Sequence, residues 1–214
     1  MKVDLEPYTP AWKETFRRHQ AIIGKALGHL QPVIDHIGST SLGSIAAKPI
    51  IDILVGLKDG QQLDDTVAPM IDAGYCYIEQ FNAGMPYRRF YAKLVPLSDV
   101  PLPIILHSGD RLAFGRNYNS IVNIHVMAHG TSHWVRHIAF RDYLLAHPEE
   151  REAYHALKLA IATIEFDDPL DYNAHKEAFI AEHQRRAIDW FLGQPGNEGL
   201  RVSLGTGETF SRDA

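Results

Sequence analysis

Asp52 is the first residue that points to chemistry, because this carboxylate lies within the apolar segment PIIDILVGL. A carboxylate buried alone is costly unless a hydrogen bond, a cation or a metal ion pairs with it. A Gly-Ser-Thr turn, residues 38–40, precedes the segment. Its backbone N–H groups and the Ser39 hydroxyl can bind phosphate oxygens, and Asp52 can bind Mg²⁺. The pattern indicates metal-assisted phosphoryl or nucleotidyl transfer, with an ordinary turn and a hydrogen-bonded strand aspartate as the alternative.

Basic residues near these positions are candidates for binding phosphate. Lys48, directly before the apolar segment, either neutralises a phosphate or marks the solvated end of a strand. Arg88 and Arg89 are adjacent in a strand-like segment, so they point to opposite faces and at most one enters a given cleft. Lys93 shares a face with Arg89. We expect Arg89 and Lys93 to bind an anionic group, with surface charge on an edge strand as the alternative.

His125 is the candidate base, and it shares a strand face with Asn123. It is either a base or metal ligand near Asp52, or a half-buried histidine with one satisfied nitrogen. His133 and His137 would share one face of a helix, as zinc ligands do. The glutamate that lies between such histidines in metalloproteases is absent, which argues against a zinc site.

The C-terminal part supplies the remaining candidates: Arg141, Tyr172 and Lys176. They are expected to line a cleft and bind the base or a second substrate. The alternative is structural, with an Arg141–Asp142 ion pair and a tyrosine that packs between helices.

Composition and charge restrict the class of protein. The chain has 214 residues, a formal net charge of −5 and one cysteine, so no intrachain disulfide and no cysteine-based zinc site is expected. The mild acidic balance argues against a general nucleic-acid coat. No apolar run resembles a signal peptide or a membrane helix, so we expect a cytoplasmic protein. The expected partner is a nucleotide or another phosphate-bearing small molecule, and no oligomeric state is indicated.

Hydrophobic periodicity and turn signals predict an α+β protein, a mixed α/β sheet followed by helices. The continuous apolar run of 48–57 predicts a strand covered on both faces. Helices are expected at 10–27, 61–73, 132–146, from 148 to about 164, and 172–191; strands are expected at 33–38, 48–57, 75–81, 88–95 and 120–129.

Several segments in the same order resemble the GrpB family, a group of small proteins with a nucleotidyltransferase-like fold. They are HIGSTSLGSIAAKPIIDILVGL, YRRFYAK, NIHVM, HIAFRDYLLAHPEEREAYHALKLAIA and YNAHKEAFI. The resemblance implies one domain over 1–192, with a sheet core at about 30–130, flanking helices and a helical bundle at about 131–192. Residues 193–214 are expected to form a flexible tail.

The resemblance also implies roles for single residues. Gly38, Ser39 and Asp52 match the superfamily pattern, whereas Leu54 occupies the position of its second acid. The third strand has Asn123 and His125 in place of a carboxylate, and this set is poor for a two-metal mechanism because Mg²⁺ prefers oxygen ligands.

The expected function is binding of a nucleoside triphosphate with Mg²⁺ or Mn²⁺, and possible transfer of a nucleotidyl group to a small hydroxyl-bearing acceptor. Asp52 would bind the metal and His125 would orient or deprotonate the acceptor, while the turn, including Thr40, would hold phosphates. The alternative is a catalytically degenerate nucleotide- or anion-binding module that serves as a sensor or partner. A third reading is a histidine-dependent metal hydrolase.

Overall fold

A computed structural model of the chain describes residues 4–164, 171–197 and 199–200, and only the backbone of 171–178. The chain divides into two compact units. The sheet unit comprises Ala11–Ile37 and Ile50–His129, and the helical unit comprises Met1–Pro10, Gly38–Pro49 and Gly130–Ala214. The predicted sheet core at about 30–130 and helical part at about 131–192 stay a prediction. One domain over 1–192 stays a prediction, and most of the predicted tail lies outside the described residues.

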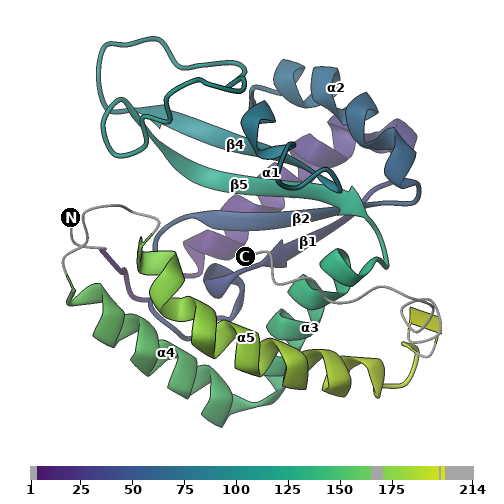
Figure 1. Cartoon of the computed structure of the whole chain (residues 1–214), viewed down its shortest axis with the longest axis vertical. Coiled ribbons are helices and arrows are strands. Elements are labelled where there is room, and N and C mark those ends of the chain that lie inside the picture. Colours follow the sequence, from purple (N-terminus) through teal and green to yellow (C-terminus); the bar gives the residue numbers. More distant parts are fainter. Residues whose placement is uncertain (1–3, 165–170, 198, 201–214) are drawn as a thin grey trace. The chain divides into compact units, whose positions relative to one another are not determined.

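The sheet unit contains a five-stranded mixed sheet in the order β1-β2-β5-β4-β3, and Figure 1 shows β1, β2, β5 and β4 side by side. β2 and β5 are parallel, and the other neighbours are antiparallel. The strands are β1 Val33–Ile37, β2 Ile51–Leu57, β3 Cys76–Tyr77, β4 Arg88–Pro96 and β5 Tyr118–Ala128. The predicted α+β class and its mixed sheet are confirmed. The expected strand at 75–81 is shorter, because the chain turns into the 3₁₀ helix η4, Glu79–Phe81.

Helices cover one face of this sheet, which we call the helix-covered face. α1, Ala11–Ala26, buries Trp12 and Ile23, and Figure 1 shows it behind the strands. The Phe16 ring stacks on His36 of β1, with 4.7 Å between the ring centroids. The expected helix at 61–73 is a 3₁₀ helix, η3 Gly60–Thr66, followed by α2 Val67–Asp72. Gly74, with φ +83°, follows that helix, as its position in the sequence predicts.

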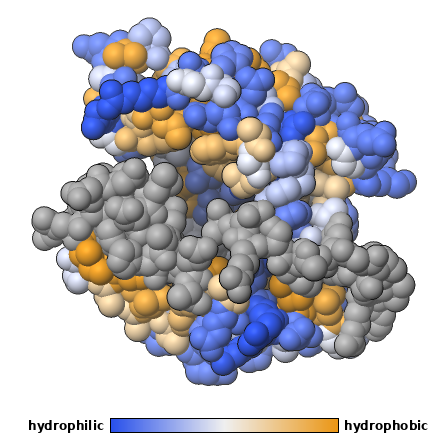
Figure 2. Space-filling view, in the orientation of Figure 1, coloured by the Kyte–Doolittle hydropathy of each residue, from blue (hydrophilic) through white to orange (hydrophobic). Residues whose placement is uncertain are grey.

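We call the opposite face of the sheet the polar face. Within the sheet unit, other segments cover only part of it. The connection 97–117 places Leu106 in a buried cluster with side chains of β3, β4 and β5: Cys76, Ile78, Phe90, Ala92, Leu94 and Tyr118. Figure 2 shows apolar residues among hydrophilic ones over this connection, at the upper left. The cluster limits the polar side chains of this face to the part formed by β1, β2, β5 and the start of β4.

Cys76 in this cluster provides a pH-dependent contribution to stability. Burial raises the pKa of its thiol from the usual 9.0 to about 11. Between these values the unfolded chain loses the proton while the folded chain retains it, so stability falls as the pH rises from 9 to 11. The expected loss is roughly 2 to 3 kcal/mol.

Urea unfolding of the wild type and of Cys76→Ala, repeated at pH values from about 8 to about 11, measures this loss of stability. The variant should show a flatter decline, while buried Tyr75 and Tyr91, whose pKa values are also raised by burial, contribute equally in both proteins. Parallel curves for the two proteins would contradict the assignment.

The helical unit is built from three helices and the loop 38–49. They are α3 Ser132–Ala146, α4 Pro148–Ala162 and α5 Asp171–Leu192, which confirms the predicted helices closely. α5 packs against both α3 and α4. Buried His183 of α5 lies 2.9 Å from a carboxylate oxygen of Glu150 on α4, and the Tyr143 hydroxyl of α3 donates to the other oxygen at 3.3 Å. Within the described residues, none of the helices has the length and apolar character needed to cross a membrane.

Candidate functional site

Asp52 lies at the start of β2 on the polar face, where a chain of side-chain hydrogen bonds reaches it. Its register partner on β5 is Asn123, whose Nδ2 donates to Asp52 Oδ1 at 3.2 Å. The Ser120 hydroxyl lies 2.7 Å from Asn123 Oδ1 and donates to it. An ionised carboxylate can only accept, so the NH₂ group of the amide faces Asp52 and the amide oxygen faces Ser120. The Asn123 amide is therefore one hydrogen-bond partner of Asp52.

His125 lies two residues farther along β5 on the same face, and Arg88 of β4 contacts it. Arg88 Nη1 and His125 Nδ1 are 3.1 Å apart. A guanidinium group can only donate, so Nδ1 accepts and the ring carries its proton on Nε2. The Arg88 guanidinium also lies 5.1 Å from the centroid of the Phe90 ring. In this arrangement His125 can donate a hydrogen bond from Nε2, and its role as a base or metal ligand stays a prediction.

Arg89 and Lys93 do not join this group, and their binding of an anionic group stays a prediction. The register pairs Arg89 with Val126, which lies on the helix-covered face. Arg89 Nε donates to Asp64 at 2.7 Å, and Lys93 Nζ donates to the Gly74 carbonyl oxygen at 3.0 Å. Strand alternation correctly separates the two arginines, but the polar face receives Arg88.

The Gly-Ser turn belongs to the helical unit and follows directly after β1 in the chain. Ile37 is the register partner of Asp52, and one peptide bond joins Ile37 to Gly38. Gly38 has φ 71° and ψ −176°, a backbone conformation that is essentially restricted to glycine. Ser39 and buried Thr40 then form the 3₁₀ turn η2, Ser39–Ser41. Lys48 is half-buried shortly before β2.

Three side chains of α4 hold the loop 38–49, and no sequence pattern indicated this role for any of them. The Tyr154 hydroxyl lies 3.5 Å from Ser39 Oγ. The Ala46 N–H donates to His155 Nε2 at 3.2 Å, and Lys158 Nζ donates to the Ala46 carbonyl at 2.6 Å. Both backbone polar groups of Ala46 are thus satisfied by one helix face, since residues three and four apart in a helix are neighbours.

The donor set around Asp52 fits a magnesium ion poorly. Leu54 is fully buried and pairs in register with His125, so β2 adds no second carboxylate beside Asp52 on this face. Asp35 of β1 adds a carboxylate to the polar face, but as a diagonal neighbour of Asp52 it is about 7 Å away. Across the described part of the chain, no three His, Cys, Asp or Glu side chains gather as a metal site. The oxygen-rich cage that Mg²⁺ requires is incomplete here.

The candidates from the C-terminal helices lie in the helical unit. Arg141 Nε donates to Asp142 Oδ1 at 2.7 Å, which is the intramolecular ion pair weighed as the alternative. Tyr172 and Lys176 are in the first turns of α5, and their side chains lie outside the described residues. Their role in binding stays a prediction.

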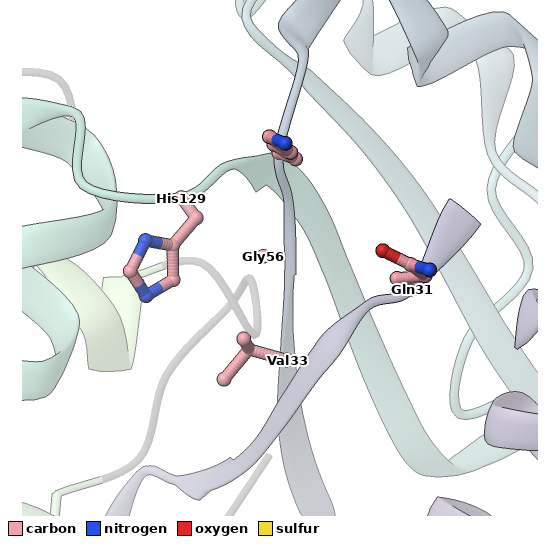
Figure 3. Close-up of a pocket in the computed structure, with 5 residues that line it drawn as sticks. Gln31, Val33, Gly56 and His129 are labelled. Atoms are coloured by element: carbon pink, nitrogen blue, oxygen red, sulfur yellow. The ribbon is translucent and has the colours of Figure 1, made fainter.

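A cavity of about 250 Å³ lies at the other end of β2 from Asp52. Figure 3 shows His129, Val33 and Gln31 around Gly56, and Lys58 completes the lining. Since none of the predicted site residues lines this cavity, it is distinct from the polar group on β2, β4 and β5.

Comparison with protein families identifies the chain. The family model described as GrpB protein matches residues 2–186. The chain belongs to the GrpB family. This GrpB chain is 29% identical to the glutamate-rich protein GrpB of Alkalihalophilus pseudofirmus, covering 85% of this chain and 93% of the relative. It is 33% identical to a UPF0157 protein of Deinococcus radiodurans, covering 86% and 82% of the two chains.

A solved GrpB structure and a second group of relatives complete the comparison. The crystal structure of conserved protein GrpB from Enterococcus faecalis matches with a TM-score of 0.68 and 27% identity, covering 88% of this chain and 99% of that chain. A protein of Mycolicibacterium paratuberculosis named dephospho-CoA kinase is 29% identical, covering 88% of this chain. This GrpB chain spans 46% of that protein, so the likeness concerns less than half of it.

Proposed function

We propose that this GrpB protein binds a nucleotide or another phosphate-bearing small molecule on the polar face of its sheet unit. The contact between Arg88 and His125 carries the proposal. A guanidinium group is permanently charged, and the imidazole beside it presents an N–H donor, so the pair suits an anionic group. Asp52 and Asn123 on the same face can accept hydrogen bonds from hydroxyl or amino groups of the ligand.

The incomplete set of oxygen ligands favours binding over metal-dependent turnover. Leu54 cannot bind a metal, and His125 presents a proton rather than a lone pair. We therefore expect hydrogen-bond donors of the protein, rather than a metal ion, to hold the ligand's anionic group. Two relatives are named dephospho-CoA kinase, which is consistent with a nucleotide-like ligand.

Nucleotidyl transfer with Mg²⁺ or Mn²⁺ is the second candidate, and Asp52 favours it because its strand position matches the first acid of the superfamily pattern. In that case the substrate's phosphates would have to complete the coordination that the protein lacks. Release of pyrophosphate from a nucleoside triphosphate distinguishes this function from binding alone.

Adjacent arginines on opposite faces give a matched test of the proposal. Arg88→Gln should weaken binding of ATP, CTP, GTP or UTP about tenfold or more, because it removes a charge-assisted hydrogen bond. Arg89→Gln changes the same charge on the other face and should leave affinity unchanged. Calorimetry with each nucleotide, with and without Mg²⁺ or Mn²⁺, measures the affinities, and a pyrophosphate assay on the same samples detects turnover.

Each outcome of that experiment decides between the candidates. Binding without pyrophosphate release supports the binding module. Metal-dependent pyrophosphate release supports the transferase. Equal losses in Arg88→Gln and Arg89→Gln, or no binding of any nucleotide by the wild type, would overturn the assignment of the polar face.

A further inference from the structure

The cavity at the end of β2 opens on the polar face of the sheet unit. Val33 lies two residues before Asp35 and Gly56 lies four residues after Asp52, so strand alternation places both on that face. Gly56 carries no side chain, so backbone forms the floor of the cavity, as Figure 3 shows. The other lining residues lie just beyond the ends of β1, β2 and β5, and they are Gln31, Lys58 and His129.

Buried side chains separate this cavity from the contact between Arg88 and His125. Met127 of β5 is the register partner of both Gly56 on β2 and Arg88 on β4, so it lies between them. Leu54, two residues before Gly56, lies between the cavity and the start of β2. Both side chains are almost completely buried. The cavity is therefore a separate position on the polar face.

The lining of the cavity carries a positive charge and hydrogen-bond donors. None of its five residues is acidic, and the Lys58 ammonium supplies a charge at an exposed position. The adjacent acid, Asp59, accepts a hydrogen bond from the Gln61 N–H at 2.8 Å and so caps η3. The side chains of Gln31 and His129 add an amide and an imidazole, and each can donate a hydrogen bond. This set of groups suits an oxyanion.

Gln31 lines the cavity in an unfavourable backbone conformation. It is the C-cap of the 3₁₀ helix η1, Gly28–Leu30, with φ 50° and ψ 53°. In the described part of the chain, every other residue with a positive φ is a glycine. This left-handed region is unfavourable for a residue with a Cβ atom, whereas glycine adopts it freely. The position therefore retains a side chain at a cost in stability, as is common where a side chain contacts a ligand.

We propose that this cavity is a second anion-binding site, which holds a small oxyanion between Lys58, Gln31 and His129. Lys58 supplies the charge, while the amide and the imidazole donate to the remaining oxygens. Val33 adds an apolar contact for a short carbon chain on the anion. The volume of about 250 Å³ is below the roughly 300 Å³ at which pockets for drug-sized ligands begin, so the ligand class is a small phosphate ester or carboxylate rather than a nucleotide.

Titrations followed by ¹H–¹⁵N NMR test the site with inorganic phosphate and with acetate. At least one probe should produce saturable shifts of the Lys58 and His129 amide signals, and the tighter binder identifies the anion as phosphate or carboxylate. Lys58→Gln removes the charge and should weaken this binding about tenfold or more. Lys25→Gln is the matched control, because it changes the same charge at an exposed position of α1 in the same unit, and it should leave the affinity unchanged.

Gln31→Gly separates a role in binding from a role in folding. The variant relieves the left-handed backbone conformation, so its Tm should equal or exceed that of the wild type. Loss of the amide should nevertheless weaken binding of the tighter probe about threefold or more. Unchanged affinity of Gln31→Gly would overturn the role assigned to this residue.

The inference goes beyond the proposed function and can fail independently of it. If neither probe shifts the Lys58 and His129 signals, or if Lys58→Gln and Lys25→Gln bind equally well, the inference is overturned. Arg88→Gln should leave binding at the cavity unchanged. An equal loss in Arg88→Gln and Lys58→Gln would show one shared site and would also overturn the inference, whereas the nucleotide titrations alone decide the proposed function.

Discussion

Leu54→Asp should lower the free energy of unfolding by about 4 kcal/mol in the presence of a chelator, because it places an uncompensated charge in a buried position. Leu54 is fully buried, and the polar face carries Asp52 two residues before it and Asp35 directly opposite it. The new carboxylate would therefore meet two others. Like charges at such separations raise the cost of ionisation and add to the loss of apolar packing.

The same substitution tests whether the site can hold a metal ion. Three carboxylates on neighbouring positions would supply the oxygen ligands that the wild type lacks, so Mn²⁺ or Mg²⁺ should restore part of the stability of Leu54→Asp. Leu54→Asn is the matched control, with similar size and no charge, and it should not respond to the ions. Urea unfolding with chelator and with each ion measures both effects. A wild type that gains as much stability from Mg²⁺ as the variant would contradict the poor fit of the natural site.

Lys158→Ala should destabilise the protein by roughly 3 kcal/mol, because it leaves the Ala46 carbonyl without its donor and creates a cavity. The Lys158 side chain is almost fully buried, and its ammonium group lies 2.6 Å from that carbonyl oxygen. Loss of the contact should also loosen the loop that carries Ser39. Chemical denaturation measures the stability, and hydrogen exchange at residues 39–47 measures the loop.

Two variants separate packing from hydrogen bonding at this position. Lys158→Met retains most of the volume and should recover the packing part of the loss, but not the protection of the loop. Leu159→Ala changes an exposed neighbour on the same helix and should cost less than about 0.5 kcal/mol. Equal stabilities of Lys158→Ala and Leu159→Ala would show that the contact with Ala46 contributes nothing.

Much of the sheet follows from local sequence patterns. The continuous apolar run of 48–57 predicts a strand covered on both sides, and β2 is buried along nearly its whole length. The alternation around Asn123 and His125 correctly predicts their shared face on β5. These features were predictable because strand periodicity depends on neighbouring residues alone.

The choice between Arg88 and Arg89 could not be made in this way. Alternation places them on opposite faces, but it does not tell which face the helices cover. That is decided by Asp64 and Thr66 of η3, which bind Arg89 and Tyr91. Such contacts join residues about 25 positions apart, and no local pattern encodes them.

The α4 contacts to the loop were missed for a related reason. Tyr154, His155 and Lys158 lie more than 100 positions from their partners in the chain. In the sequence they look like ordinary helix residues, since aromatic and basic side chains are common on amphipathic helices. A buried lysine becomes visible only when the structure shows which backbone group it satisfies.

The opposite orientation of the adjacent arginines limits how β4 can change during evolution. Insertion or deletion of a single residue before Arg88 would shift the strand by one position and exchange the two faces. Arg88 would then meet Asp64, Tyr91 would move to the surface that holds His125, and the contact between Arg88 and His125 would be lost together with part of the core. The connection 97–117 follows the register shift between Lys93 and Leu94. We therefore expect homologues to vary in length there rather than in the segment 82–88.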